Sequence, residues 1–410
     1  MRFDQYSFHP NILDNLKALK FVRPTDIQFK AISPIMKGED VLAIAQTGTG
    51  KTAAFAIPVI DYLAKSLKHQ KQRKVRCLVM EPTRELSLQI TDVFNSIAAN
   101  TGVKVVNLFG GVSQDEQVKG LLNGADVVVS TPGRMFDLIH QGHLKLDGLE
   151  ILVVDEADHM LDLGFYKDIK DILRHIPRER QTLFFSATIN ERIKKLAYSI
   201  VRNAIRIQIS PENPVNKNIQ HQVAFIEMDD KRFFLERLVN EFDTARILVF
   251  VRTKVRAERV KNALERAGIS SETIHGDKDQ SDRLNVLEGF KTGKNRILIA
   301  TDVSARGIDI AGVEIVVNYD LPELPENYVH RVGRTGRGGK KGQAVSFCSK
   351  EEKVLLKEIE SYIGSDIEVM KIDRESYQET ISFTADETQN DWQNLIRETD
   401  AFKPKAKKGR

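Results

Sequence analysis

Short apolar stretches alternate with longer amphipathic segments along most of the chain. In the first half the apolar stretches are rich in β-branched residues and lie at 41–45, 77–80, 103–109, 126–130, 151–154 and 182–185. Strands that are apolar throughout, without alternation, are buried on both faces, which is typical of a parallel sheet covered by helices. The pattern therefore predicts an α/β fold in which parallel strands and helices alternate.

The same rhythm restarts in the second half, with apolar stretches at 222–225, 247–251, 297–300, 313–317 and 343–348. Between the two halves, residues 209–218 are polar and contain two prolines, which is typical of a linker. We therefore expect a first domain over 1–208, a linker over 209–218 and a second domain over 219–371. The remaining residues, 372–410, are polar and end in a lysine-rich run, so we expect a flexible basic tail.

A helical stripe precedes the first predicted strand. Ile12, Leu13, Leu16 and Leu19 recur at helical spacing, and Pro10 stands where the first turn would begin. Proline is favoured at that position because the first turn leaves its N–H groups without helical partners. This helix should pack on the first domain.

Composition narrows the class of protein. A chain of 410 residues is long enough for two domains, and 41% hydrophobic and 29% charged residues are typical of a globular protein. The net charge of +4 argues only weakly for a polyanionic partner. Cys77 and Cys348 lie within apolar stretches, which favours core thiols in a reducing compartment over a disulfide or metal site. No apolar run approaches a membrane span, so we expect a cytoplasmic protein.

A phosphate-binding loop follows the first predicted strand. Its residues are Ala45, Gln46, Thr47, Gly48, Thr49, Gly50, Lys51 and Thr52. Glycines allow backbone N–H groups to converge on phosphate oxygens at a helix N-terminus, the lysine adds a positive charge, and the threonine hydroxyl can bind Mg²⁺. The strict motif opens with glycine where this chain has Ala45. A glycine-rich turn without a ligand is the weaker alternative.

An acidic string, Asp155-Glu156-Ala157-Asp158, follows the predicted strand at 151–154. In one parallel sheet these carboxylates would stand beside the phosphates, where Asp155 suits Mg²⁺ and Glu156 suits a base that activates water. An acidic string alone is more often a solvated loop. Its place after a buried strand and downstream of a phosphate loop favours the catalytic interpretation.

That string resembles the signature of the DEAD-box RNA helicases, and other motifs of the family surround it in order from Phe3 to Arg337. The resemblance implies two tandem RecA-like domains that bind ATP and Mg²⁺. It also implies that Gln28 pairs with the adenine edge, as a side-chain amide can, and that Phe3 stacks on the ring. Lys20 belongs to the same segment and stands where the family usually has glycine.

The second half supplies arginines in the string 330–337, where surface salt bridges are the plainer alternative. The resemblance implies that Arg334 and Arg337 are arginine fingers, that His330 belongs to the catalytic set and that Asp309 contacts the ribose. Such fingers accelerate phosphoryl transfer by roughly 10³ to 10⁵. Ser186 and Thr188, with Asp158, resemble the motif that couples hydrolysis to unwinding, although paired hydroxyls at a strand end are also an ordinary helix cap.

Several segments connect the carboxyl end of a predicted strand to the following helix. In parallel sheets, ligands commonly bind at the edge formed by these strand ends. The resemblance implies that these segments contact the RNA backbone. The candidate residues are Pro82, Thr83, Arg84, Gly111, Thr131 and Arg134 in the first domain and Arg252, Thr253, Gly276, Gln280, Arg283, Thr301 and Asp302 in the second. Contacts limited to phosphate and 2′-OH predict binding without strong sequence preference but with a preference for RNA.

The sequence thus predicts an ATP-dependent RNA helicase that unwinds short duplexes or remodels RNA–protein complexes. An ATP-gated RNA clamp with little turnover is the alternative, and a DNA-directed helicase is a second one. We expect a monomeric core, with ribosome-assembly or RNA-decay proteins as possible partners. Trp392 receives no role, and the final lysines either add nonspecific RNA affinity or solvate the terminus.

Overall fold

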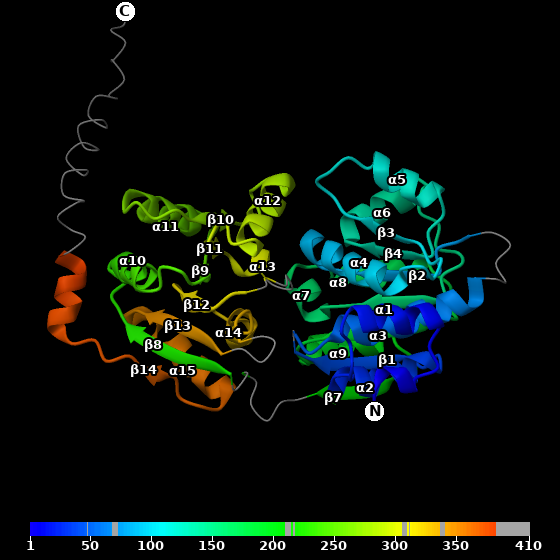
Figure 1. The fold of residues 1–410 in the computed structure, drawn as a ribbon, viewed down its shortest axis with the longest axis horizontal. Coiled ribbons are helices and arrows are strands. Elements are labelled where there is room, and N and C mark those ends of the chain that lie inside the picture. The colour runs from blue at the N-terminus through cyan, green and yellow to red at the C-terminus, as the bar shows by residue number, and fades with distance from the viewer. Residues whose placement is uncertain are drawn as a thin grey trace, which may run out of the picture.

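Two parallel sheets, each flanked by helices, make up the protein (Figure 1). The computed structural model describes residues 1–46, 48–67, 73–209, 215, 218–305, 310, 312–336 and 341–382. The first domain contains the N-terminal half of the chain and lies on the right in Figure 1, and the second lies on the left. Both sheets have seven strands, and every strand pairing described in them is parallel. The predicted pair of parallel α/β domains is confirmed.

The first sheet has the order β3-β4-β2-β5-β6-β1-β7. Its strands are β1 (Val41–Ala45), β2 (Cys77–Met80), β3 (Val105–Leu108), β4 (Val127–Ser130), β5 (Ile151–Val154), β6 (Gln181–Ser186) and β7 (Ile205–Ile209). The helices are α1 (Pro10–Ala18), α2 (Asp26–Met36), α3 (Lys51–Ser66), α4 (Arg84–Ala98), α5 (Asp115–Leu122), α6 (Pro132–His140), α7 (Ala157–Asp162), α8 (Tyr166–Asp171) and α9 (Glu191–Tyr198). One apolar core lies between the sheet and α1 to α4, and another lies between the sheet and α6 to α9.

The second sheet has the order β10-β11-β9-β12-β13-β8-β14. Its strands are β8 (Ile219–Phe225), β9 (Ile247–Phe250), β10 (Glu272–Ile274), β11 (Ile297–Ala300), β12 (Ile315–Asn318), β13 (Gly342–Cys348) and β14 (Glu368–Val369). The helices are α10 (Lys231–Glu241), α11 (Lys254–Arg266), α12 (Gln280–Lys291), α13 (Asp302–Ala305), α14 (Pro325–Val332) and α15 (Lys353–Ile363). If each strand is matched by its place in the order, β1 corresponds to β8, β2 to β9 and β5 to β12. The second domain therefore repeats the first in architecture.

The predicted strands are present with shifts of a few residues at their ends. The sequence analysis missed β7, β10 and β14. The strand β7 alternates exposed and buried positions at a sheet edge, β10 has three residues and β14 has two, so none carries a long apolar signal. Helix α1 begins at Pro10 as predicted, and Cys77 and Cys348 are buried free thiols.

The predicted tail begins with a segment that packs on the second domain. Residues 374–382 are helical, and the ring of Tyr377 lies 4.9 Å from that of Phe234 in α10. The Tyr377 hydroxyl donates to Asp230 at 2.8 Å, and Arg237 donates to the Thr380 hydroxyl at 2.6 Å. Trp392 and the lysine-rich end lie outside the described residues. No helix in the described part of the chain has the length and apolarity to cross a bilayer.

Candidate active site

The predicted phosphate loop joins β1 to α3, in the strand–loop–helix context that the sequence required. Gly48 and Gly50 have φ values of +79° and +93°, in the left-handed region that glycine adopts without strain. Helix α3 then begins at Lys51, with Thr52 beside it. Backbone N–H groups of the first helical turn have no intrahelical acceptor, so this end of α3 is suited to bind an anion. Thr47 lies outside the described residues.

The N-terminus of α2 holds this loop in place. The Thr25 hydroxyl donates to the Thr49 carbonyl at 2.8 Å, and Gln28 Nε2 donates to the Gly50 carbonyl at 3.1 Å. Gln28 Oε1 accepts from the Thr25 N–H at 3.0 Å. A Cβ added at Gly50 would run into Gln28, so glycine is needed there for space as well as for its backbone angles. The predicted adenine-binding amide is thus fixed against the predicted phosphate loop.

Two other residues predicted at the nucleotide have different surroundings. The Phe3 ring packs near those of Phe21 and Tyr6 and is only 3% exposed, so a base could stack on it only after this cluster opens. Lys20 is exposed and follows the end of α1 with φ +61°, the left-handed region where the helicase family's glycine would be unstrained. The stacking role of Phe3 stays a prediction.

A buried ion pair faces the phosphate loop. Lys51 Nζ lies 2.9 Å from Glu156 Oε1, and both side chains are less than one-tenth exposed. Burial alone would raise the pKa of Glu156, but the Lys51 ammonium outweighs it and lowers that pKa to about 2. Glu156 also has φ +46°, which is strained for a residue with a side chain. The strained turn therefore places the Glu156 carboxylate directly beside Lys51, and the ammonium group of Lys51 keeps it ionised.

Two more carboxyl groups lie next to this pair. Burial raises the pKa of Asp155 to about 7, against the opposing effect of Lys51, and one of its oxygens accepts from the Glu156 N–H at 2.8 Å. Glu81, directly after β2, is 0% exposed, and neither of its carboxylate oxygens has a hydrogen-bond partner. Burial, then the charges of Asp155 and Glu156, raise the pKa of Glu81 well above its ordinary value. The sequence analysis gave Glu81 no role.

Two of the three predicted coupling residues, Thr188 and Asp158, are in contact. The backbone N–H and the hydroxyl of Thr188 both donate to Asp158 Oδ2, at 3.0 and 3.1 Å. Ser186 ends β6 and is fully buried. The acidic string after β5 is thus joined to the loop after β6.

The second domain brings the end of α14 toward these carboxylates. His330 is close enough to contribute electrostatically to the lowered pKa of Glu156. Arg334 is 2% exposed, and its Nε donates to the His330 carbonyl at 3.0 Å. Arg337 and Asp309 lie outside the described residues, so their predicted roles stay predictions.

Arg331, the first arginine of the same string, has a different partner set. It is 2% exposed, and its Nε and Nη2 donate to the two oxygens of Asp302 at 2.5 and 2.8 Å. Its Nη1 donates to the Asp320 carbonyl at 2.6 Å. Asp302, predicted to contact RNA, therefore ties α13 to α14. Sequence alone gave no sign of this pairing, because the two residues are 29 positions apart.

The strand order divides the first sheet into two halves whose predicted functions differ. The strands β5, β6 and β1 are neighbours and carry the acidic string, the coupling residues and the phosphate loop. The strands β3, β4 and β2 are also neighbours and carry the three segments predicted to contact RNA. The second sheet groups β10, β11 and β9 in the same way, with the loops of Gly276, Thr301 and Arg252. Each group therefore forms one continuous edge.

Close packing shapes this edge in the first domain. A Cβ at Gly111 would occupy the position of the Arg84 guanidinium, and Gly111 has φ +78°. Arg134 donates to Gln117 at 3.0 Å and to the Val112 carbonyl at 2.9 Å. Pro82 and Thr131 are buried, whereas Arg84 and Arg134 remain partly exposed. Thr83 is also partly exposed and Gly111 is exposed, so these residues and the two arginines keep accessible surface for a ligand.

On the second domain's edge, Thr253 caps α11 by accepting from the Arg256 N–H at 3.2 Å. Arg252 and Gly276 are exposed. The Arg252 N–H donates to Asp320 at 2.9 Å, which fixes the backbone of this loop. Arg252 therefore keeps surface for a ligand while its backbone is anchored.

Buried hydrogen bonds join the two domains along these edges. Arg84 Nη1 donates to Gln280 Oε1 at 3.2 Å, and Gln280 Nε2 donates to Glu85 Oε1 at 3.0 Å. Arg283 Nη2 lies 2.9 Å from the same Glu85 oxygen. Glu85 is 2% exposed and Gln280 is 3% exposed. Glu85 is a further residue that the sequence analysis missed, since an acid in a first helical turn is usually explained by the helix dipole.

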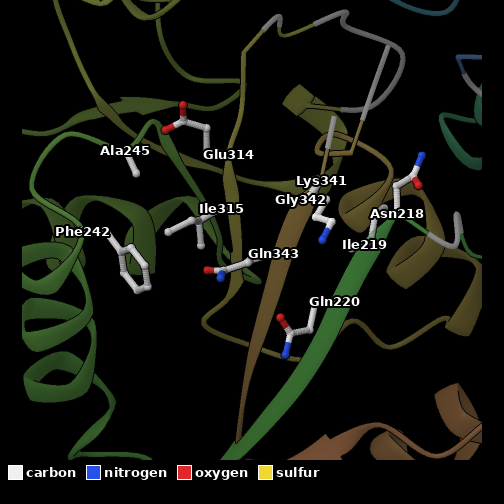
Figure 2. Close-up of a pocket in the computed structure, with 10 residues that line it drawn as sticks. All are labelled: Asn218, Ile219, Gln220, Phe242, Ala245, Glu314, Ile315, Lys341, Gly342 and Gln343. Carbon is white, nitrogen blue, oxygen red and sulfur yellow. The ribbon is translucent and has the colours of Figure 1, made fainter. Parts of the chain in front are cut away.

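A pocket of about 530 Å³ lies elsewhere, at the opposite end of the second sheet (Figure 2). Its walls come from the starts of β8, β12 and β13 and from Phe242 and Ala245 after α10. Ligands of open α/β sheets bind outside the carboxyl ends of the strands. This pocket is thus separate from the predicted ATP and RNA edges.

Comparison with known proteins decides the family. A model described as DEAD/DEAH box helicase matches residues 25–196, and one described as helicase conserved C-terminal domain matches 230–339. The chain belongs to the DEAD/DEAH box helicase family. Among its relatives, the ATP-dependent RNA helicase DbpA of Bacillus subtilis is 38% identical over 377 residues, which are 92% of this chain and 77% of DbpA.

Solved structures of the same family differ in how well both domains superpose together. Dbp5 of S. cerevisiae bound to RNA and ADP BeF3 gives a TM-score of 0.81 at 30% identity, covering 94% of this chain and 99% of Dbp5. A DEAD box protein from Methanococcus jannaschii gives only 0.52 at 37% identity, covering 90% of this chain and 99% of that protein. Both matches span both domains, so the TM-scores reflect how the two domains are arranged. The higher score indicates that the domains of this chain are arranged more like those of Dbp5 bound to RNA and nucleotide.

Proposed function

We propose that this chain is an ATP-dependent RNA helicase, which binds single-stranded RNA without sequence preference and separates short duplexes locally. The proposal rests on one observation above all. The buried Lys51–Glu156 pair of the first domain faces His330 of the second, while Glu85 and Arg283 join the domains beside the predicted RNA edge. A site assembled from both domains makes ATP turnover depend on domain closure.

The nucleotide contacts that we propose follow from this geometry. The Gln28 amide, held here by the Gly50 carbonyl, turns to pair with adenine when the nucleotide binds. The N–H groups at the start of α3 bind phosphate oxygens, and Lys51 supplies positive charge. Glu156 orients the attacking water and accepts its proton once the phosphates draw Lys51 away, because the Lys51 ammonium otherwise lowers the pKa of this carboxylate. Arg334 and Arg337, with His330, stabilise charge on the transferred phosphoryl group.

Thr52 and Asp155 would hold Mg²⁺. In the described residues no group of three or more His, Cys, Asp or Glu side chains is arranged to hold a metal alone. That finding fits Mg²⁺, which usually takes one or two protein ligands and completes its shell with phosphates and water. The unpartnered carboxyl oxygens beside Asp155 also fit a cation with bound waters. When bound, Mg²⁺ would neutralise charge on the phosphates.

RNA would lie across the two matched strand groups, with Arg84, Arg134 and Arg252 at its phosphates. Contacts of this kind bind RNA with a steep salt dependence and without base recognition. A closed cleft that accepts only a bent single strand would disrupt a short duplex locally, and hydrolysis would reopen the cleft. Ribosome-assembly or RNA-decay proteins are the partners that we propose, for a monomeric core. The buried free cysteines support a cytoplasmic location.

The decisive experiment compares steady-state ATP turnover with and without single-stranded RNA, in wild type and Glu156→Gln. We expect RNA to stimulate the wild type, and the variant to lose about 10² to 10⁴ of turnover, which is the usual contribution of a general base. Turnover indifferent to RNA, or to this substitution, would overturn the proposal.

A matched variant and a matched substrate separate the alternatives. Glu179→Gln changes an exposed carboxylate at the amino end of β6, away from the phosphate loop, and should leave turnover near the wild-type value. An RNA clamp would bind RNA with ATP yet turn over slowly in the wild type as well. Equal unwinding of matched DNA and RNA duplexes would instead favour a DNA-directed helicase.

A further inference from the structure

Glu81 lies inside the first domain at the border between the two halves of the sheet. The pairing of β2 with β5 sets Met80 opposite Val154, and the Asp155 N–H donates to the Met80 carbonyl at 3.2 Å. Carried one residue further, the same register sets Glu81 opposite Asp155. Both side chains then point to the face of Val79 and Val153, because side chains alternate along a strand.

That face is the one covered by α3, whose first residue is Lys51. Glu81 therefore joins Asp155 and Glu156 around the end of the phosphate loop. The charges of Asp155, Glu156 and Lys51 all act on it, which places it within their reach. Both of its oxygens are buried without a hydrogen-bond partner. A carboxyl group left unpartnered in a protein interior costs free energy, so its retention here calls for an explanation.

The second domain shows that the fold itself does not need an acid at this position. The Glu81 N–H donates to the carbonyl of Ser130 at the end of β4, and the Val251 N–H donates to that of Ala300 at the end of the matching β11. Val251 is fully buried in the apolar core. An apolar side chain thus fills the equivalent place in the same architecture without a buried polar group.

We propose that Glu81 is an additional carboxylate of the Mg²⁺–nucleotide site, which accepts hydrogen bonds from water molecules bound to the ion that Asp155 and Thr52 hold. The inference rests on the proposed function, since it assumes that ion. Carboxylates that bind through such waters orient the coordination shell, and their loss typically weakens metal binding about 10-fold to 100-fold. Glu81 is therefore a positioning residue and makes no contact with ATP.

The test measures metal binding rather than turnover. Binding of a fluorescent ADP derivative is titrated with Mg²⁺ at constant pH for wild type, Glu81→Gln and Glu81→Val. We expect the half-saturating Mg²⁺ concentration to rise at least about 10-fold in both variants. Nucleotide affinity in chelator should be unchanged or tighter, because a negative charge near the phosphates is gone. Asp147→Asn, at an exposed carboxylate paired with Lys74, is the charge-matched control and should leave the Mg²⁺ titration unchanged.

Glu81→Val copies the side chain of the matched position in the second domain. It should raise the melting temperature of the metal-free protein while weakening Mg²⁺ binding, because it removes an unpartnered buried acid. A lower melting temperature with unchanged Mg²⁺ binding, or failure of both variants to fold, would mean that Glu81 serves the fold and would overturn the inference.

The outcomes also separate this inference from the proposed function. If wild-type nucleotide binding does not respond to Mg²⁺, the metal assignment of the proposed function is wrong and Glu81 loses its role with it. If the wild type responds and Glu81→Gln matches it, only the role of Glu81 is wrong.

Discussion

The two domains place a buried lysine at the same point of the same architecture. Lys51 begins α3 after the first strand of one sheet, and Lys231 begins α10 after the matching strand of the other. Each faces a carboxylate that follows the matched strands β5 and β12, namely Glu156 at 2.9 Å and Asp320 at 3.8 Å. The correspondence indicates one structural plan used twice.

The surroundings of the two lysines then differ. In the second domain Glu352 lies 2.5 Å from Lys231, and the Tyr319 carbonyl accepts from the same ammonium at 2.8 Å. Glu352 also accepts from the backbone N–H groups of Leu321 and Ser349, so its charge is satisfied within the protein. In the first domain the loop that leads into Lys51 contains Gly48 and Gly50, and Glu81 has no hydrogen-bond partner. Buried polar groups that have hydrogen-bond or ion-pair partners within the protein stabilise its fold. Buried polar groups without such partners are available to bind a ligand.

The largest effect should separate the two lysines. Lys231→Met removes the buried cation beside Asp320 and Glu352 and leaves them only the partly exposed Arg256 and Arg252. Loss of one partner of a buried pair costs about 3–5 kcal/mol of unfolding free energy. Lys51→Met should cost less stability, since Lys51 pairs with one carboxylate and is 5% exposed whereas Lys231 pairs with two and is 0% exposed, yet it should lose nucleotide binding. Chemical unfolding followed by circular dichroism, with hydrogen exchange to assign each domain, measures both. Equal losses of stability would break the comparison.

The second effect concerns the contact between the domains. Arg283→Ala leaves Glu85 buried and unpaired when the domains close, at a cost of about 2–5 kcal/mol. RNA affinity with a nonhydrolysable ATP analogue should therefore fall at least about 30-fold, which corresponds to 2 kcal/mol. Fluorescence anisotropy with labelled single-stranded RNA measures this loss.

The same titration without nucleotide distinguishes two roles for Arg283. If the arginine acts through Glu85, affinity without nucleotide should stay within a few-fold of wild type. If it contacts RNA directly, affinity should fall equally in both states. Arg266→Ala, at the exposed end of α11, controls for the loss of one positive charge.

The smallest effect concerns the strained turn at Lys20, which follows α1 and should change stability alone. Lys20→Gly should stabilise the first domain by up to about 1 kcal/mol, because a side chain at φ +61° is unfavourable and glycine is not. Lys17→Gly, at an exposed position inside α1, should destabilise it by about 1 kcal/mol. Thermal unfolding measures both changes. A loss of stability in both variants would show that the turn carries no strain.

The alternation of apolar stretches was enough to predict both sheets, because buried parallel strands leave a continuous signal. It could not reveal β14, whose two residues pair with β8 only because the chain returns there after α15. The apolar pattern also could not show that residues 374–382 pack on α10. The Phe234–Tyr377 contact joins two segments that are far apart in the sequence.

The phosphate loop and the acidic string could also be predicted, because each is a run of neighbouring residues in the sequence. Local motifs did not predict the partners of Arg331 or Glu85, which come from other elements or the other domain. Glu81 was overlooked for another reason. An acid directly after a strand is commonly solvated, and only the three-dimensional position shows both of its oxygens buried.

Gln280 and Arg283 stand one helical turn apart on α12, and both reach the same oxygen of Glu85. A small rotation of that helix would withdraw both donors together and leave the buried Glu85 carboxyl group without these hydrogen bonds. Partly closed arrangements of the two domains are therefore unfavourable. We expect the contact at Glu85 to be either fully formed or fully broken.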